Sequence, residues 1–147
     1  MSATILAHGG RLVNRLVVEA EADELSHRVC EVPRIRLTDR QRSDVELIAT
    51  GALIPLAGFM GQADYLGVIR EVRLASGLPW SLPITLAIHE EEVSQIRGGG
   101  RLALADADGP LAVLLVHEIF EADLATETQE VYGTRDAAHP GVRTLTP

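Results

Sequence analysis

Five histidines are the side chains best suited to bind a metal ion or to move a proton near neutral pH. They are His8, His27, His89, His117 and His139. Two ligands on one helix face must stand three or four residues apart, and no two of these histidines have that spacing. The sequence therefore predicts no metal site and assigns no metal ligand.

Three further motifs suggest chemistry, and each lacks a necessary part. The glycines Gly98–Gly100 before Arg101 do not have the spacing of a phosphate-binding loop, and the chain contains no lysine. Cys30 lies in an apparent strand, where it is expected to be buried. Asp106 and Asp108 lack the remaining ligands of a calcium loop and are predicted to be turn residues. No catalytic or cofactor-binding residue and no cofactor is predicted.

An aromatic residue near two arginines leaves two interpretations open. Arg70 and Arg73 precede Trp80, and together they could form an exposed surface for a nucleotide or a partner protein. The alternative is that Arg73 pairs with Asp64 or Glu71 on a helix surface while Trp80 packs in the core. We favour the alternative, because isolated surface arginines are common.

The composition indicates one compact domain of an ordinary cytoplasmic protein. The chain has 147 residues, 46% of them hydrophobic, and a formal net charge of −8. An acidic chain repels polyanions on average, so nucleic acid is an unlikely partner. A single cysteine excludes a disulfide framework, and no signal peptide or apolar run of membrane-spanning length is present. The expected localisation is cytoplasmic, without a membrane partner.

The hydrophobic period changes repeatedly along the chain, which is typical of a mixed α+β domain. The patterns predict strands over 12–18 and 29–37, then a helix over 39–50 started by a capping box at Thr38 or Ser43. The elements predicted after it are a helix end at Gly51, a pinned loop over 52–61, a helix over 62–76, a strand over 84–88, a helical turn at 90–92, a hairpin of 101–105 with 111–120 around Asp108-Gly109, and a helix from Leu124 to Gly133.

Several local motifs follow one another in a fixed order between positions 44 and 86. They are Asp44-Val-Glu-Leu-Ile48, Pro55-Leu-Ala-Gly58-Phe59-Met60, Asp64-Tyr65, Arg73-Leu74 with Ser76-Gly77, and Trp80-Ser81-Leu82-Pro83-Ile84-Thr85-Leu86. With His8-Gly9-Gly10 before them and His139-Pro140-Gly141-Val142 after them, they resemble the N-terminal, PUA-like domain of ATP sulfurylase (sulfate adenylyltransferase). Nearly the whole chain is covered by the resemblance.

The resemblance implies an α+β fold, a PUA-like pseudobarrel of short, mostly antiparallel strands with packed helices. It places this domain at 1–136 and makes 137–147 a tail similar to the linker toward the family's catalytic domain. That domain carries a Gln-x-Arg-Asn-Pro-x-His element which binds ATP and sulfate, and the element does not occur between Met1 and Pro147. The chain alone is therefore expected to be inactive.

The function implied is that of a non-catalytic domain with a structural or docking role in a sulfate adenylyltransferase. The assembled enzyme converts ATP and sulfate to adenosine phosphosulfate and pyrophosphate with magnesium, so the implied partner is the catalytic domain or subunit. A homo-oligomer is compatible with this role. Two alternatives stay open: a stand-alone PUA-like module that binds RNA or a small ligand, and a fragment that serves only protein association.

A docking surface for this partner is predicted around the loop 52–61. Its candidate residues are Leu53, Phe59, Met60 and Trp80, because large apolar side chains in a loop of glycine and proline either fill their own core or cover a partner. For a single residue the first outcome is the more common one. Leu56 and Phe59 are the side chains most suited to fill the core of the domain itself.

Overall fold

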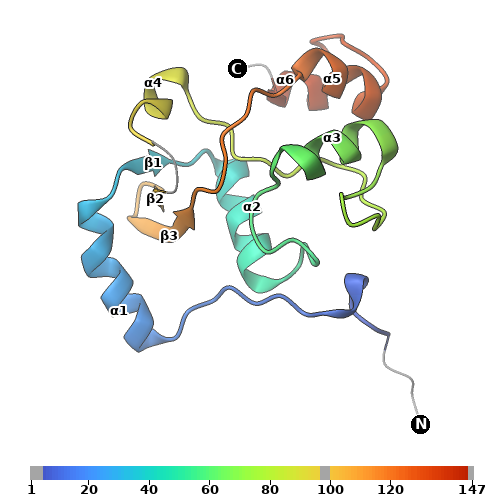
Figure 1. Cartoon of the computed structure of the whole chain (residues 1–147). Coiled ribbons are helices and arrows are strands. Elements are labelled where there is room, and N and C mark those ends of the chain that lie inside the picture. The colour runs from blue at the N-terminus through green and yellow to red at the C-terminus, as the bar shows by residue number, and fades with distance from the viewer. Residues whose placement is uncertain (1–4, 97–99, 146–147) are drawn as a thin grey trace. The chain divides into compact units, whose positions relative to one another are not determined.

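The computed structural model describes residues 5–96 and 100–145, which form helices and one small sheet (Figure 1). The chain divides into two compact units. The first comprises Met1–Phe59 and Leu86–Glu118, and the second comprises Met60–Thr85 and Ile119–Pro147. Each unit buries apolar side chains of its own. The predicted α+β class is confirmed.

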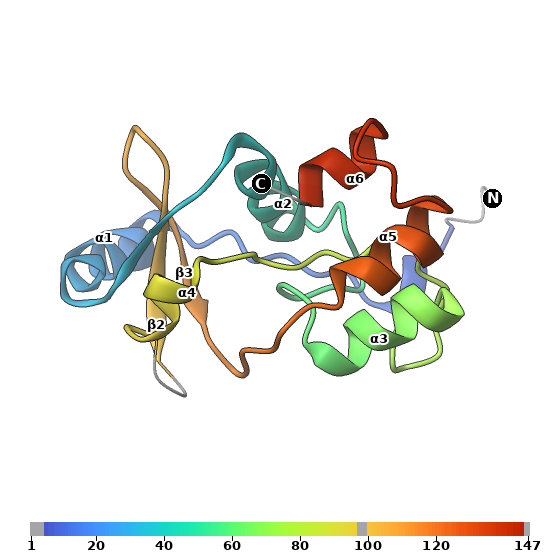
Figure 2. The same ribbon diagram turned by 90° about the horizontal axis from the view of Figure 1, so that it is seen from above.

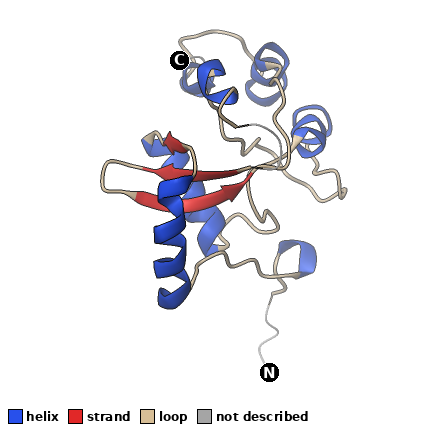
Figure 3. Ribbon diagram, turned by 60° about the vertical axis from the view of Figure 1, so that its left-hand side comes forward, coloured by secondary structure: helices blue, strands red, loops and turns tan. Residues whose placement is uncertain are grey.

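The sheet of the first unit has three strands in the order β1-β2-β3 (Figure 3). They are β1 (Arg34–Arg36), β2 (Arg101–Ala105) and β3 (Pro110–Leu115). β2 and β3 form the predicted antiparallel hairpin, which the Asp106 amide closes by donating to the Gly109 carbonyl at 3.0 Å. β1 pairs with β2 in parallel, so the sheet is mixed. Local sequence could predict the hairpin but not the parallel neighbour.

Helix α2 (Asp39–Thr50) begins and ends where the sequence predicts. Of the two candidate capping boxes, Thr38 with Gln41 forms: the Gln41 amide donates to Thr38 Oγ1 at 3.3 Å, and the Thr38 amide donates to Gln41 Oε1 at 2.9 Å. Ser43 lies within the helix and donates to the Asp39 carbonyl. Gly51 ends the helix at a φ of 80°, the left-handed conformation that glycine adopts without strain.

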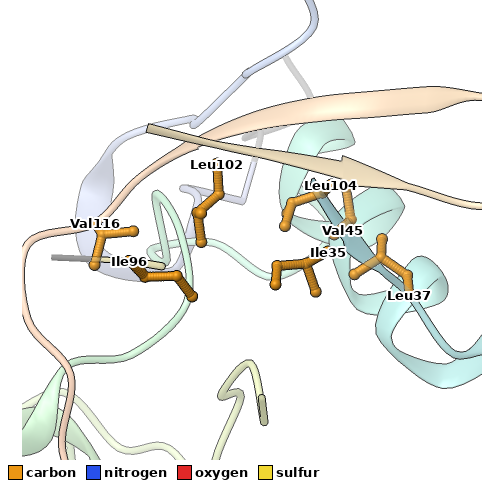
Figure 4. Packing of buried hydrophobic residues seen from close by; sticks show 7 residues of the cluster. All are labelled: Ile35, Leu37, Val45, Ile96, Leu102, Leu104 and Val116. Carbon is orange, nitrogen blue, oxygen red and sulfur yellow. The ribbon is translucent and has the colours of Figure 1, made fainter. Parts of the chain in front are cut away.

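The core of the first unit lies between α2 and one face of the sheet (Figure 4). Alternation along the strands directs Ile35, Leu102 and Leu104 to this face, where they meet Val45 of α2. Leu37, Ile96 and Val116 complete the buried cluster, and Phe59, Leu86 and Ile88 pack against it. The opposite face carries Ala103 and Val113, and α1 (Glu19–Arg28) crosses it (Figure 3).

The prediction of a strand over 29–37 is wrong for most of its length. Helix α1 and the 3-10 turn η2 (Val29–Glu31) lead into β1, which keeps only three residues. Helix α1 has no buried residue, so it lacks the apolar stripe by which a helix is usually recognised. Its charges indicate it instead: Glu19 and Glu21 lie in the first turn, and Arg28 pairs with Glu24 at 2.9 Å.

The strands predicted over 12–18 and 84–88 do not form. The 84–88 segment is extended, but its carbonyl groups have partners outside a sheet. Ile84 accepts from the Met60 amide at 2.8 Å, and Ala87 accepts from the Gln41 side chain at 2.8 Å. The alternation in this segment reflects side-chain burial, with Leu86 and Ile88 on the core, and not strand pairing.

The second unit is built from α3 (Gln62–Glu71), α5 (Leu124–Tyr132) and α6 (Pro140–Leu145), which lie together in Figures 1 and 2. Helix α3 buries Tyr65, Val68 and Ile69 as predicted. It ends at Glu71 and not near 76, because Val72 takes a left-handed φ of 56° and turns the chain back against Gly67. A Cβ at Gly67 would lie 2.6 Å from the Arg73 carbonyl oxygen, so only glycine permits this approach.

The remaining short elements follow the sequence closely. They are α4 (Glu90–Val93), predicted as a helical turn at 90–92, and the end of α5 at Gly133, where φ is 69°. A 3-10 turn η1 (His8–Gly10) precedes them in the chain. The predicted tail contains α6, whose Val142 is buried. The domain boundary at 136 stays a prediction. Among the residues described, no helix has the length and apolarity needed to cross a membrane.

A buried hydrogen bond joins α3 to α5 within the second unit. Tyr65 Oη donates to Glu127 Oε2 at 2.9 Å, and the two residues are only 1% and 4% exposed. The Tyr65 ring also packs against Phe120, with 5.3 Å between ring centroids. A buried carboxyl group is costly unless it is hydrogen-bonded, so this contact fixes how the two helices pair.

We predict that Tyr65→Phe lowers the free energy of unfolding by about 1 to 3 kcal/mol, because it removes a donor from a buried oxygen. Urea unfolding followed by circular dichroism measures the change. Tyr132→Phe is the matched control, since the Tyr132 hydroxyl has no hydrogen-bond partner among the described residues. Equal stability of the two variants would show that the Tyr65 hydroxyl does not stabilise the fold.

The same contact predicts a pH dependence in alkaline solution. Burial, and then the hydrogen bond to Glu127, raise the pKa of Tyr65 well above its ordinary value. The unfolded chain loses this proton near pH 10, while the folded chain keeps it. The contribution of Tyr65 to the free energy of unfolding is therefore constant below that pH and falls above it by about 1.4 kcal/mol per pH unit. Unfolding of wild type and Tyr65→Phe between pH 9 and about 11 should show the steeper loss in wild type. Parallel curves would contradict this.

Candidate functional site

The residues suited to metal binding are scattered. Within 5–96 and 100–145, no three His, Cys, Asp or Glu side chains are placed to hold a metal ion. His8, His27, His89 and His117 are exposed on separate elements. His139 is half-buried and packs against the Tyr132 ring at a centroid distance of 5.4 Å. The described residues therefore offer no preformed metal centre.

Cys30 corrects one prediction. The sequence predicts that it is buried in a strand, but it lies in η2 and is exposed. The cause is the same as for the lost strand: the backbone here turns, and Val29 rather than Cys30 faces inward.

Asp106 and Asp108 are turn residues, as predicted. Asp106 Oδ1 accepts from the amides of Asp108 at 2.8 Å and Gly109 at 3.1 Å. Its other oxygen lies 3.1 Å from Arg42 Nη1, an ion pair that ties the hairpin turn to α2. Arg42 also donates to Glu46 at 3.0 Å, and this hydrogen bond, followed by the charge of Asp106, raises the pKa of Arg42. These groups stabilise structure and leave no oxygens arranged for calcium.

The carboxyl groups with shifted pKa values have structural explanations. Burial raises the pKa of Asp44 on α2, and the charge of Arg40 opposes the shift. Asp123 caps α5, and its hydrogen bonds from Thr126 lower its pKa. A single acid of raised pKa can accept or release a proton, but it cannot bind the phosphates of a nucleotide.

A small pocket opens in the first unit beside α1. Its volume is about 190 Å³, and Leu25, Arg28, Glu31, Val32, Arg101 and Val113 line it. Pockets for cofactors and substrates usually measure roughly 300 to 1,000 Å³. Of the three glycines before Arg101, the structure describes only Gly100, because Gly98 and Gly99 lie outside the described residues. The pocket is too small to be a nucleotide site.

In the loop 72–82 of the second unit, Arg73 does not form the predicted ion pair with Asp64 or Glu71 among the described residues. The interpretation of Arg70, Arg73 and Trp80 as an exposed surface stays a prediction. Arg73 Nη1 donates to the Gly77 carbonyl at 3.0 Å, and Asp64 accepts from the Ala75 amide instead of pairing with an arginine. Trp80 is half-buried, and its indole donates to the Leu82 carbonyl at 2.7 Å. The loop is thus held by its own hydrogen bonds.

The four residues proposed for docking differ in exposure. Leu53, Phe59 and Trp80 are half-buried, and Phe59 packs on the core of the first unit. Met60 is only 5% exposed, and its sulfur accepts from the Ile84 amide at 3.5 Å. Met60 is therefore a core residue, and a docking surface can use only the other three. Their docking role stays a prediction.

The comparisons with known proteins agree with this geometry. The sequence model of the PUA-like domain family matches residues 5–147.

The chain belongs to the PUA-like domain family.

The curated relatives of this PUA-like domain are longer enzymes. It is 50% identical over 146 residues to a sulfate adenylyltransferase of Symbiobacterium thermophilum, covering 99% of the chain and 37% of that protein. It is 47% identical over 142 residues to a probable bifunctional SAT/APS kinase of Sorangium cellulosum, covering 96% of the chain and 24% of that protein. The domain thus spans about a third or less of these relatives, and its likeness to the N-terminal domain of ATP sulfurylase is confirmed.

A solved structure shares the fold. The hexameric APS kinase from Thiobacillus denitrificans superimposes with a TM-score of 0.71 at 33% sequence identity. The match covers 82% of this chain and 24% of that one. The PUA-like domain again corresponds to one part of a larger protein.

Sequence reasoning missed a group of exposed apolar side chains, which lies in the first unit before α1. The group includes Leu12, Leu16 and Val18, assigned above to a strand. The signal was present, since the segment is rich in Leu and Val, but periodicity does not show whether an extended segment is paired.

We predict that Met60→Asp unfolds the second unit, because an unpaired charge in place of a buried side chain costs several kcal/mol. Leu82→Asp is the matched control in the same unit, since Leu82 is 37% exposed. Thermal unfolding should show a transition lowered by more than about 10 °C for Met60→Asp and by a few degrees for the control. An unchanged unfolding transition for Met60→Asp would show that Met60 is exposed and not a core residue.

Proposed function

We propose that this PUA-like domain serves as a non-catalytic domain of a sulfate adenylyltransferase. The observation that carries the proposal is the 50% identity, over nearly the whole chain, to about a third of such an enzyme. Identity at this level over 146 residues supports the same fold and, as part of the proposal, the same role. The proposed role is structural: the domain docks on the remainder of the enzyme and supports it.

The reaction proposed for the assembled enzyme joins ATP and sulfate to give adenosine phosphosulfate and pyrophosphate, with magnesium. Such chemistry depends on donors that hold phosphate oxygens and on oxygens that bind the metal ion. Among the described residues, no three His, Cys, Asp or Glu side chains are placed to hold a metal ion, and the pocket beside α1 is small. These observations support assigning the chemistry to the part of the enzyme that this chain does not match.

The partner proposed is the catalytic domain, in the same chain or in another one, with Leu53, Phe59 and Trp80 as contacts. Self-association is part of the proposal, supported by the hexameric state named for the structural neighbour. A cytoplasmic location completes it, supported by the single cysteine. The net charge of −8 favours a protein partner over RNA.

We predict that the isolated chain releases no pyrophosphate from ATP, sulfate and magnesium above the buffer blank. A chimera should be active in which this chain replaces the matching part of the Symbiobacterium enzyme. Its kcat/KM should lie within about tenfold of the parent, a loss below about 1.4 kcal/mol, because only surrounding residues change.

The parent enzyme and a version without the matching part are the controls. Turnover by the isolated chain, persisting through repeated purification, would overturn the non-catalytic role. A folded but inactive chimera would overturn the assignment to this enzyme.

A further inference from the structure

The first unit begins with a segment, residues 5–18, that we name the arm. Six large apolar side chains of the arm are between 44 and 94% exposed. They are Ile5, Leu6, Leu12, Leu16, Val17 and Val18. Single exposed leucines are normal on a soluble protein, but six within one short segment mark a surface that another protein part covers.

The arm is nevertheless held in a defined place against the end of α2 (Figure 1). The Arg15 amide donates to the Ala49 carbonyl at 2.9 Å, and Arg15 Nε donates to the Ala57 carbonyl at 3.1 Å. These bonds fix its middle, while the apolar side chains on both sides of Arg15 stay exposed. A segment fixed in this way loses little further entropy when a partner covers it.

Gly51 makes this position of the arm possible. A Cβ on Gly51 would overlap with the Val13 carbonyl oxygen, closer than any side chain tolerates. Gly133 ends α5 with a similar φ of 69°, against 80° at Gly51, yet a Cβ there would meet nothing within 4 Å. The two glycines therefore share the demand for a left-handed backbone, and only Gly51 also accommodates the arm.

What covers the arm follows from the lengths of the relatives. The arm joins no strand of the described sheet, and its six large apolar side chains are exposed to a partner. The chain matches only 37% of the Symbiobacterium sulfate adenylyltransferase, so the larger part of such an enzyme lies outside the match. We propose that this larger part covers the arm, which is a docking segment. The inference rests on the function proposed above.

The test uses the isolated chain and the active chimera described above. Trypsin cleaves after Arg11 and Arg15 in the arm. Cleavage at Arg11 should be at least about tenfold slower in the chimera than in the isolated chain, because cleavage follows local opening of the backbone. Leu12→Asp with Leu16→Asp should abolish this protection. Leu111→Asp with Leu115→Asp, which changes two exposed leucines on β3, should leave it unchanged.

A second pair of variants separates placement of the arm from general destabilisation. Gly51→Ala should weaken protection of Arg11 in the chimera severalfold, whereas Gly133→Ala, with the same backbone strain and no close neighbour, should not. Equal effects of the two would contradict the role of Gly51 in holding the arm.

The outcomes separate this inference from the proposed function. An active chimera whose arm is cleaved as fast as in the isolated chain overturns the inference and leaves the proposed function intact. A folded but inactive chimera overturns both the proposed function and the inference about the arm. Protection that appears in the isolated chain as its concentration rises, together with dimers in analytical ultracentrifugation, would show a second copy as the partner and overturn the inference.

Discussion

The parallel pairing of β1 with β2 is the constraint on which the first unit depends. It joins Ile35 to Leu104 across a long stretch of chain, and the core forms only when both strands and α2 are in place. Burying each large apolar side chain contributes about 1.5 to 3 kcal/mol, so Ile35, Leu102 and Leu104 stabilise the unit only together. The first unit is therefore discontinuous in sequence, because β2 comes from its second segment, Leu86–Glu118. The second unit consists of the intervening residues Met60–Thr85 and of Ile119–Pro147.

Elements specified by neighbouring residues could be predicted from the sequence. Thr38 and Gln41 satisfy each other's backbone groups, so the start of α2 needs no distant contact. Asp106 closes its hairpin through the next three residues, and Gly133 ends α5 by its own conformational freedom. Elements specified by distant partners could not. The parallel neighbour of β1 is invisible in a local pattern, and α1 lacks the buried stripe that would have indicated it.

The docking residues could likewise be predicted only in part from the sequence. An apolar side chain is recognisable from the sequence, but whether it is buried depends on what the fold brings over it. Met60 in its loop and Leu12 in the arm are similar in hydrophobicity, yet Met60 is covered by the chain around Ile84 and Leu12 is not. The sequence therefore makes the loop 52–61 the candidate for docking and predicts a strand over residues 12–18 of the arm. Family resemblance could not separate them either, because it identifies a fold and not the exposure of a residue.

Docking of the arm, as proposed, would link the stability of this domain to the assembly of a larger enzyme. Burying the six large apolar side chains of the arm would contribute a free energy of the order of 10 kcal/mol, before the entropic cost of association is subtracted. That is comparable with the whole stability of an ordinary domain. A partner that covers the arm binds the folded form and not the unfolded one, so it stabilises the fold by mass action. Because Gly51 keeps the arm in place beforehand, most of this energy is available for association and little is used to order the segment. In this proposal, the domain influences through the arm how well the enzyme assembles.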